Sequence, residues 1–200
     1  MQIVVASNNL GKIKEYQQLL KPFNIDVLTM NDVNVHGEAD ETGKNFKENS
    51  LLKASYVKKY TNLPIIADDS GLIIEELPNL LGVYSARFLG HETPYKIKRA
   101  KILELLENKN RAAYFECCIT LLNYDDKVHQ FQGRINGKIA SQESGVNGFG
   151  YDAIFIPNGY SKTFAELDEK EKNSISHRGI AVKKLMEFLK ENYNENTINK

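Results

Sequence analysis

Acidic side chains gather at two places in the chain and are the first candidates for chemistry. Asp68 and Asp69 follow an apolar run, and Asp40 and Glu41 lie upstream in a polar stretch. Carboxylates at the end of a buried strand are costly unless something binds them. Magnesium takes one or two such oxygen ligands together with substrate phosphates, and a further carboxylate can take a proton from an attacking water. An Asp-Ser-Gly turn that caps its own backbone explains Asp68 and Asp69 equally well.

A second candidate is the polar segment near the N-terminus, Ser7-Asn8-Asn9-Leu10-Gly11-Lys12. It stands between a predicted strand and a predicted helix, an order that suits phosphate when the backbone amides point outward from the helix start. Lys12 would add an ammonium group. A plain helix N-cap, in which Asn or Ser satisfies free amides, is the competing interpretation. The segment does not have the glycine–lysine spacing of the common phosphate loop.

Two further segments lie toward the C-terminus. In Gly148-Phe149-Gly150-Tyr151-Asp152 the glycines let the backbone approach a ligand closely, and an aromatic ring could stack on a base. Asp152 could accept a hydrogen bond from a purine N–H, whereas a turn with a core aromatic is the alternative. Lys172 and the run Ser176-His177-Arg178 place positive charge near a predicted helix start, which opposes the helix dipole unless an anion or polar ligand lies nearby. A solvated basic face is the alternative there.

Composition excludes other classes. The 200 residues carry 26 basic and 26 acidic side chains, which argues against duplex nucleic acid or an anionic membrane as a partner held by net charge. Three of the histidines lie far apart without metal-ligand spacing, and no nucleophile-elbow motif occurs. The adjacent Cys117 and Cys118 suit buried, reduced thiols in a cytoplasmic protein. The charge run from Lys96 to Lys101 predicts a solvated helix face.

The elements that must position these side chains alternate between strands and helices. Apolar runs predict strands, and helical spacing predicts helices. The expected strands are Gln2–Ala6, Ile25–Met30, Leu63–Ala67, Leu72–Ile74, Tyr114–Leu122, Val128–Gly133 and Ala153–Ile156. The expected helices are Ile13–Leu20, Gly43–Tyr60, Pro94–Leu106 and Ser176–Lys190. A tight turn is predicted over Asp68–Gly71. The pattern indicates an α/β protein with a mixed sheet.

The chain shows no repeat, linker or clean boundary, and we expect one domain over residues 1–191. Residues 192–200 are polar and poor in apolar side chains, so a frayed tail is predicted. The N-terminus has no basic region, which speaks against a signal peptide.

Taken in order, these segments resemble the inosine triphosphate pyrophosphatase family, the XTP/dITP diphosphatases. The matching blocks are Ala6–Lys12, Glu41–Gly43 with Phe46 and Glu48-Asn49, Ala67–Leu72, Gly82–Arg87, Gly148–Asp152 and Ser174–Arg178. Each block is weak alone, but together they cover the chain from Ile3 to Leu189.

The resemblance implies hydrolysis of a nucleoside triphosphate to the monophosphate and pyrophosphate, with a preference for ITP, dITP and XTP. It also implies Mg²⁺ as cofactor, a homodimer, and an elongated mixed α/β fold with two lobes around a central nucleotide cleft. Two other functions stay open. One is a pyrophosphatase for pyrimidine or modified nucleotides, and the other is a nucleotide-binding module without catalysis.

Site residues follow from the resemblance by position. Asp69 would be the general base and a metal ligand, and the second metal carboxylate would come from Asp40 or Glu41, of which the register favours Asp40. The substrate-binding residues would be Ser7, Asn8, Asn9, Leu10, Gly11, Lys12, Lys53, Ser70, Phe149, Gly150, Tyr151, Asp152, Lys172, His177 and Arg178. Lys12 and Lys172 would stabilise phosphate charge, and His177 and Arg178 would donate to the 6-oxo group of the base.

Overall fold

Six strands form one mixed sheet in the order β2-β1-β3-β4-β5-β6. The computed structural model describes residues 1–198 and the side chains of residues 1–192. The strands are β1 (Gln2–Val5), β2 (Asp26–Leu28), β3 (Ile65–Ile74), β4 (Ala112–Leu122), β5 (His129–Ile139) and β6 (Phe155–Pro157). β1 is parallel to β2 and β3, and the pairs from β3 to β6 are antiparallel. The predicted α/β class with a mixed sheet is confirmed.

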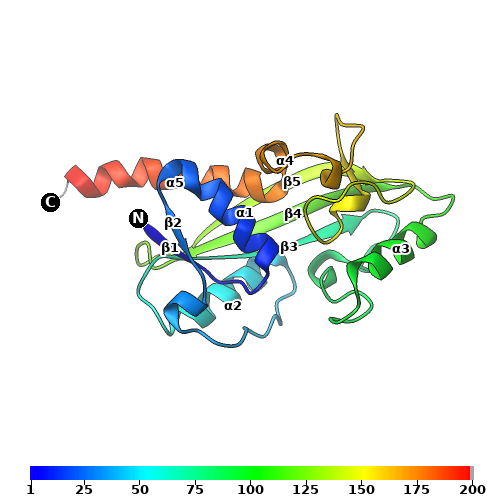
Figure 1. Ribbon diagram of the computed structural model, residues 1–200. Coiled ribbons are helices and arrows are strands. Elements are labelled where there is room, and N and C mark those ends of the chain that lie inside the picture. The colour runs from blue at the N-terminus through cyan, green and yellow to red at the C-terminus, as the bar shows by residue number, and fades with distance from the viewer. Residues whose placement is uncertain (199–200) are drawn as a thin grey trace.

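Helices cover both faces of this sheet (Figure 1). They are α1 (Leu10–Leu20), α2 (Phe46–Lys58), α3 (Tyr95–Leu105), α4 (Glu169–Ile175) and α5 (His177–Ile198). Alternation along β1 assigns the faces, because Ile3 and Val5 pack with α1 and α5 whereas Val4 and Ala6 pack with α2. α3 lies at the opposite end of the elongated molecule from β1 and β2 (Figure 1).

The turn predicted over Asp68–Gly71 is wrong, because β3 continues through it without a break. Every residue from Ile65 to Ile74 pairs with β4 in one antiparallel register. Ten successive pairs outweigh the turn preference of the Asp-Asp-Ser-Gly composition, since strand preference depends on context. Neighbouring side chains of a strand point to opposite faces, so Asp68 and Asp69 do not lie together at the edge of a turn.

The long strands β3, β4 and β5 join two lobes. At one end the sheet packs between α2 and the pair α1 and α5. At the other end a separate core contains Leu72 and Ile74 of β3, Ile102 of α3, Phe155 of β6 and the buried Phe164. Figure 1 shows β3–β5 running along the molecule between these ends. Residues placed midway along β3 therefore lie between the lobes.

The predicted C-terminal helix Ser176–Lys190 corresponds to α5, which has the bounds His177–Ile198, and the short helix α4 before it was not predicted. A frayed tail is expected over residues 192–200. The structure describes side chains up to residue 192 and backbone up to residue 198, so most of this prediction lies outside the described residues. Among the described residues no helix combines the length and the apolar character that a membrane crossing requires.

Candidate active site

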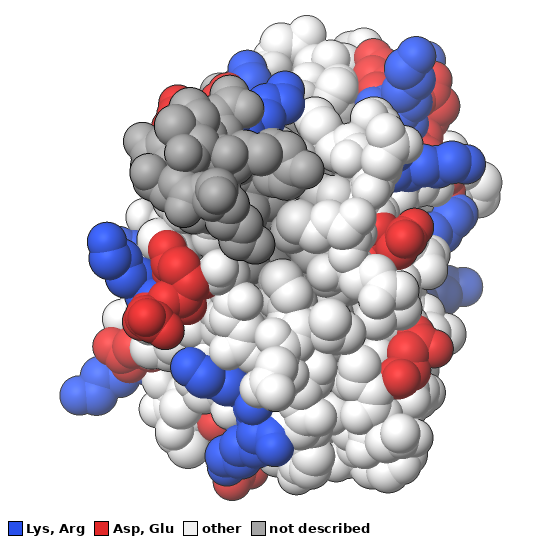
Figure 2. Space-filling view, turned by 90° about the vertical axis from the view of Figure 1, so that its left-hand side faces the viewer, with Lys and Arg blue, Asp and Glu red and all other residues white. Residues whose placement is uncertain are grey.

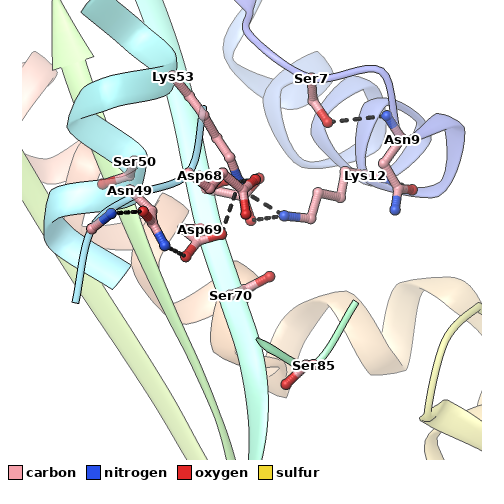
Figure 3. Close-up of polar contacts among 12 residues, drawn as sticks. Ser7, Asn9, Lys12, Asn49, Ser50, Lys53, Asp68, Asp69, Ser70 and Ser85 are labelled. Carbon is pink, nitrogen blue, oxygen red and sulfur yellow. Dashed lines mark hydrogen bonds and ion pairs between the residues drawn. The ribbon is translucent and has the colours of Figure 1, made fainter. Parts of the chain in front are cut away.

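The candidate site begins where β1 ends and leaves one edge of β3 unpaired. The carbonyl oxygens of Pro64 and Ile66 accept hydrogen bonds from the amide of Val4 in β1 and from that of Ala6 just after it. The next carbonyl in this series, that of Asp68, has no strand of the described residues beside it and accepts from the ammonium groups of Lys53 at 3.3 Å and Lys12 at 3.5 Å. The open edge of β3 thus faces cations from α1 and α2 (Figure 3).

Lys53 also joins two carboxylates on the α2 side of the sheet. Its Nζ lies 2.8 Å from Oδ1 of Asp69 and 2.6 Å from Oε1 of Glu41. Asn49, one turn earlier on α2, donates to Oδ2 of Asp69 at 3.1 Å. Both Asp69 oxygens therefore have partners, and the carboxylate is fixed in orientation. Burial lowers the pKa of Lys53, but Asp69 and Glu41 outweigh burial and raise it above its usual value.

These acids fit a divalent cation that is completed by substrate. Glu41 and Asp69 already hold one positive charge between them in the form of Lys53. Among the described residues no three His, Cys, Asp or Glu side chains lie close enough to hold a metal ion by themselves. Mg²⁺ suits such a site, because it commonly binds one or two carboxylates and fills its other positions with water and phosphate oxygens.

Asp68 points to the opposite face and is the centre of a buried ion cluster. Its Oδ2 lies 2.7 Å from Nη2 of Arg178 and 3.2 Å from Nζ of Lys12. Burial raises the pKa of this carboxyl, but the charges of Arg178, Lys12 and Lys53 hold it well below its usual range. Asp68 is therefore a permanent anion that orients cations, and it has no proton to exchange at neutral pH.

Glu15 of α1 extends this cluster toward α4 and α5. It forms ion pairs with Arg178 and with Lys172, and Lys172 Nζ lies 2.6 Å from both Glu15 and Asp152. Burial raises the pKa of Glu15, but two cations lower it below the usual value. Asp152 has one cation and a neighbouring anion, so burial prevails and its pKa is raised.

His177 is the first residue of α5 and lies in the cleft as an uncharged ring. It stacks on Phe115 with ring centroids 4.7 Å apart, and its Nδ1 is buried without a partner among the described residues. Burial and the nearby charges of Arg178 and Lys172 bring its pKa well below 6.5. The imidazole is neutral at pH 7, whereas the sequence predicted positive charge at this helix start.

The N-terminal segment serves two purposes. Asn9 caps α1 by accepting from the Lys12 amide at 3.1 Å, and Ser7 Oγ accepts from the Asn9 amide at 3.1 Å. The N-cap interpretation is therefore correct for Asn9, yet Ser7, Asn8, Asn9 and Lys12 also line the cleft. Leu10 points to solvent with 80% of its surface exposed, so only its backbone could serve a ligand in this arrangement.

The glycine-rich segment forms a tight turn against α1. Asp152 accepts from the Phe149 amide at 2.8 Å, and Gly148 has a φ of +71° that favours glycine. A Cβ on Gly11 would lie 2.6 Å from the Phe149 ring, so the absence of a side chain at Gly11 lets the ring rest on the first turn of α1. This contact brings the Phe149 segment of the second lobe onto the first lobe.

The structure brings most of the predicted site residues into one cleft. Those that line it are Ser7, Asn8, Asn9, Lys12, Glu41, Lys53, Asp69, Ser70, Phe149, Gly150, Tyr151, Asp152, Lys172, His177 and Arg178. Leu10, Gly11 and Asp40 do not line it. Asp40 is exposed, and its neighbour Glu41 contacts Lys53, so the geometry favours Glu41 over the residue that the register favoured.

Sequence reasoning missed Glu15 and Asn49 as members of the site. Both are buried on helices, with 7% and 0% of their surface exposed. Glu15 stands beside the apolar positions Ile13 and Tyr16. A charged residue next to the buried apolar side of a helix is the sequence signal that could have identified it. Asn49 belongs to the matching block Glu48-Asn49, but its role shows only once its contact with Asp69 is placed.

Comparison with known proteins agrees with this geometry. The Ham1 family profile matches residues 3–188. The chain is 40% identical to a dITP/XTP pyrophosphatase of Protochlamydia amoebophila, with 94% of this chain and 98% of that protein covered. It is 41% identical to a protein of the same name from Desulforamulus reducens, with 96% and 98% covered.

Solved structures give the same result. A HAM1 protein from Coxiella burnetii superimposes with a TM-score of 0.85 at 40% identity, covering 96% of this chain and 99% of that one. The Staphylococcus aureus Ham1 protein has a TM-score of 0.84 at 37% identity, covering 96% and 100%. A profile match over nearly the whole length, together with these identities, settles the relationship: the chain belongs to the Ham1 family.

Proposed function

We propose that this protein hydrolyses non-standard purine nucleoside triphosphates, namely dITP, ITP and XTP, to the monophosphate and pyrophosphate. The observation that carries the proposal is the group formed by Glu41, Lys53 and Asp69 at the open edge of β3. In a member of the Ham1 family, whose relatives bear the name dITP/XTP pyrophosphatase, this group provides a cation site, a base and a phosphate contact in one place.

Glu41 and Asp69 would hold Mg²⁺ with substrate phosphate oxygens completing its coordination. When bound, the ion supplies charge neutralisation on the phosphates and polarises the reacting phosphorus. A cation held there would take the position of Lys53 between the two carboxylates, and Lys53 would then be free to contact phosphate. Its raised pKa keeps it positively charged throughout the neutral range.

Asp69 would act as the general base toward water. Asn49 fixes one of its two oxygens, and this contact does not depend on Lys53, so the carboxylate needs little reorganisation to meet a water in a defined direction. Ser70, the next residue of β3, donates or accepts on the opposite face and is already held by Arg178 Nη2 at 3.0 Å.

The phosphates would lie along the start of α1. Lys12 and Lys53 approach the same carbonyl of β3 from two sides, and a chain of phosphates placed there would meet both ammonium groups. Ser7, Asn8 and Asn9 would contribute hydroxyl and amide groups from the segment before the helix, and the helix start favours the anion. Leu10 and Gly11 would take part through their backbone alone.

The base would enter between the Phe149 segment and α5. Phe149 offers a ring face, Gly150 and Tyr151 continue the wall, and Asp152 can accept from a purine N–H. His177 is neutral, so one ring nitrogen donates and the other accepts. A donor directed at the 6-oxo group matches inosine or xanthosine and opposes the 6-amino group of adenine, which leaves a buried donor unpaired at a cost of about 1–3 kcal/mol.

Arg178 would support this site more than it would contact the base. Its guanidinium is only 2% exposed and already binds Glu15, Asp68 and Ser70. Lys172 is likewise shared between Glu15 and Asp152. Both residues line the cleft, and through Glu15 they link α1 to α4 and α5.

We further propose a cytoplasmic homodimer built from one domain over residues 1–191, with residues 192–200 as a polar tail. The family resemblance supports the dimer. The two free, buried thiols of Cys117 and Cys118 suit a reducing compartment.

Turnover of a nucleotide panel tests this function. Purified protein with Mg²⁺ is given ITP, XTP, dITP, dUTP, dTTP and GTP, and pyrophosphate release is measured for each. We expect ITP, XTP and dITP, which lack the 2-amino group of GTP, to be hydrolysed well ahead of the others. Preference for dUTP or dTTP would replace the proposal with a pyrimidine pyrophosphatase, and tight binding without pyrophosphate release would indicate a binding module.

A further inference from the structure

The segment from Gly82 to Arg87 is one of the sequence blocks to which no role has been given, and it is packed closely against β3. A Cβ on Gly71 would lie 2.2 Å from the carbonyl oxygen of Gly82, so the two backbones touch where β3 has no side chain. Ser85 Oγ accepts from the Leu72 amide at 3.0 Å and donates to the Gly82 carbonyl at 2.6 Å. The segment is thereby fixed two residues beyond Asp69.

Two further hydrogen bonds hold the same segment from the second lobe. The Tyr151 hydroxyl donates to the Ser85 carbonyl at 2.6 Å, and Lys98 Nζ donates to the Ala86 carbonyl at 2.6 Å. Lys98 is 1% exposed, so the prediction that the charge run on α3 is a solvated face is wrong at this position. Arg87 therefore extends from a backbone that β3, α3 and Tyr151 all hold in place.

Glu41, in contrast, lies on a long connection without helix or strand. No regular element occurs among the described residues between the short turn Asn31–Val33 and α2. Its carboxylate has two partners from different lobes: Oε1 pairs with Lys53 at 2.6 Å, and Oε2 pairs with Arg87 Nη2 at 3.2 Å. Arg87 itself is not among the residues that line the cleft, so its contact with Glu41 is made outside the cleft.

We propose that Arg87 is a positioning residue that holds the Glu41 carboxylate in place for the divalent cation. The inference rests on the proposed function, because it takes Glu41 as a ligand of that cation. In the structure Glu41 pairs with Lys53 and with Arg87. If a cation takes the place of Lys53 at Oε1, the pair with Arg87 is the one of these two that remains. Groups that bind a metal ligand from outside commonly contribute about 10–100-fold to metal affinity or activity.

The test is direct cation binding to the full-length chain without nucleotide. Mn²⁺ serves as the probe, and its dissociation constant is measured by electron paramagnetic resonance for wild type, Arg87→Ala and Arg87→Lys. Arg134→Ala is the matched control, because Arg134 also contacts a tyrosine ring but extends from β5 and does not line the cleft. Circular dichroism and thermal unfolding establish that each variant is folded.

We expect Arg87→Ala to weaken Mn²⁺ binding about tenfold. This is the low end of the usual range, because the ion pair of Arg87 and Glu41 is partly exposed. Arg87→Lys should bind Mn²⁺ with an affinity between those of Arg87→Ala and wild type. In the activity assay the Mg²⁺ concentration for half-maximal rate should rise by a similar factor, while kcat at saturating Mg²⁺ and the ranking of nucleotides stay as in wild type. Arg134→Ala should match wild type in all of these.

An unchanged Mn²⁺ dissociation constant in folded Arg87→Ala would overturn the inference, whether or not turnover falls. A loss of kcat at saturating Mg²⁺ with normal Mn²⁺ binding would mean that Arg87 acts on substrate. If Arg87→Ala does not fold, Arg87→Lys decides by the same dissociation constant. Failure of the proposed function is seen separately, as absence of ITP hydrolysis by the wild-type protein.

Discussion

Lys53 is the residue on which the charge balance of the cleft depends. It joins Glu41 to Asp69 and contacts the Asp68 carbonyl in the same position. A single ammonium thus lies between two carboxylates that would otherwise repel each other across the open edge of β3, and it offsets one of their two negative charges. Since its position overlaps the proposed cation site, metal binding and release of Lys53 toward phosphate would be one event.

At this scale the identity of the second metal carboxylate is testable with a matched pair of variants. Glu41→Gln removes a charge that contacts Lys53, whereas Asp40→Asn removes one from an exposed neighbour outside the cleft. We expect Glu41→Gln to raise the Mg²⁺ concentration for half-maximal pyrophosphate release by at least about tenfold, and Asp40→Asn to leave it unchanged. The reverse order would restore the interpretation based on register.

His177 makes a pH-dependent contribution to stability. Burial, Arg178 and Lys172 hold its folded pKa well below 6.5, whereas the unfolded chain takes up a proton near pH 6.5. Stability is therefore lost as pH falls through 6.5, with a limiting slope of about 1.4 kcal/mol per pH unit. Replacing His177 by Gln should remove this loss.

Urea unfolding of wild type and His177→Gln at about pH 7.5 and about pH 5.5 measures the effect. Wild type should lose about 1.4 kcal/mol more than the variant between the two pH values. Equal losses in the two proteins would show that the imidazole is not held neutral in the folded state.

At the scale of elements, α5 is positioned by its contact with β5. A Cβ on Gly133 would lie 2.0 Å from the His177 carbonyl oxygen and 2.7 Å from the Ala181 amide. This close approach places the first turn of α5, with His177 and Arg178, over the sheet. The close packing on β5 thus fixes how near to the sheet His177 and Arg178 lie.

Gly133→Ala tests this contact. We expect it to destabilise the protein by about 1–3 kcal/mol in urea unfolding, because the clash is with backbone that must shift. It should also raise KM for ITP more than it lowers kcat, since α5 is displaced while Asp69 stays in β3. The control is Gln132→Ala, an exposed neighbour on the same strand. A stability equal to that of wild type would show that α5 adapts freely.

The apolar periodicity and the helix caps predicted most helices and strands, but they did not predict where one strand continues without a break. β1, α1, α2 and α3 were found within a few residues, because each has a clear apolar pattern bounded by polar or proline residues. β3 was cut short because the Asp-Asp-Ser-Gly composition is typical of turns, and only pairing with β4 shows the strand to continue. The short helix α4 was missed because its apolar pattern is brief.

The sequence predicted which residues form the site better than it predicted how those residues are arranged. Six separated blocks pointed to one nucleotide site, and the structure brings them to one cleft. Sequence could not show that Asp68 and Asp69 face opposite sides of the sheet, that His177 is neutral, or that Glu15 pairs with Arg178. Each of these depends on contacts between residues distant in the chain.

At the scale of the whole molecule, the net charge of zero does not show how the individual charges are arranged. The face shown in Figure 2 carries basic and acidic side chains next to one another around a broad area with neither. In the cleft the charges also alternate, with Lys12 and Arg178 on Asp68 and Lys53 between Glu41 and Asp69. Such a balanced site does not attract long polyanions by net charge, and a nucleotide that arrives with Mg²⁺ has two of its negative charges already offset by the ion.

The central claim is that this cleft converts a non-standard purine triphosphate to the monophosphate and pyrophosphate through Asp69. The most direct measurement is product analysis of dITP with Mg²⁺, using wild type and Asp69→Asn. Wild type should release dIMP and pyrophosphate in equal amounts, and Asp69→Asn, folded as judged by circular dichroism, should be slower by about 10²–10⁴-fold. Release of dIDP and inorganic phosphate, or wild-type turnover by Asp69→Asn, would contradict it.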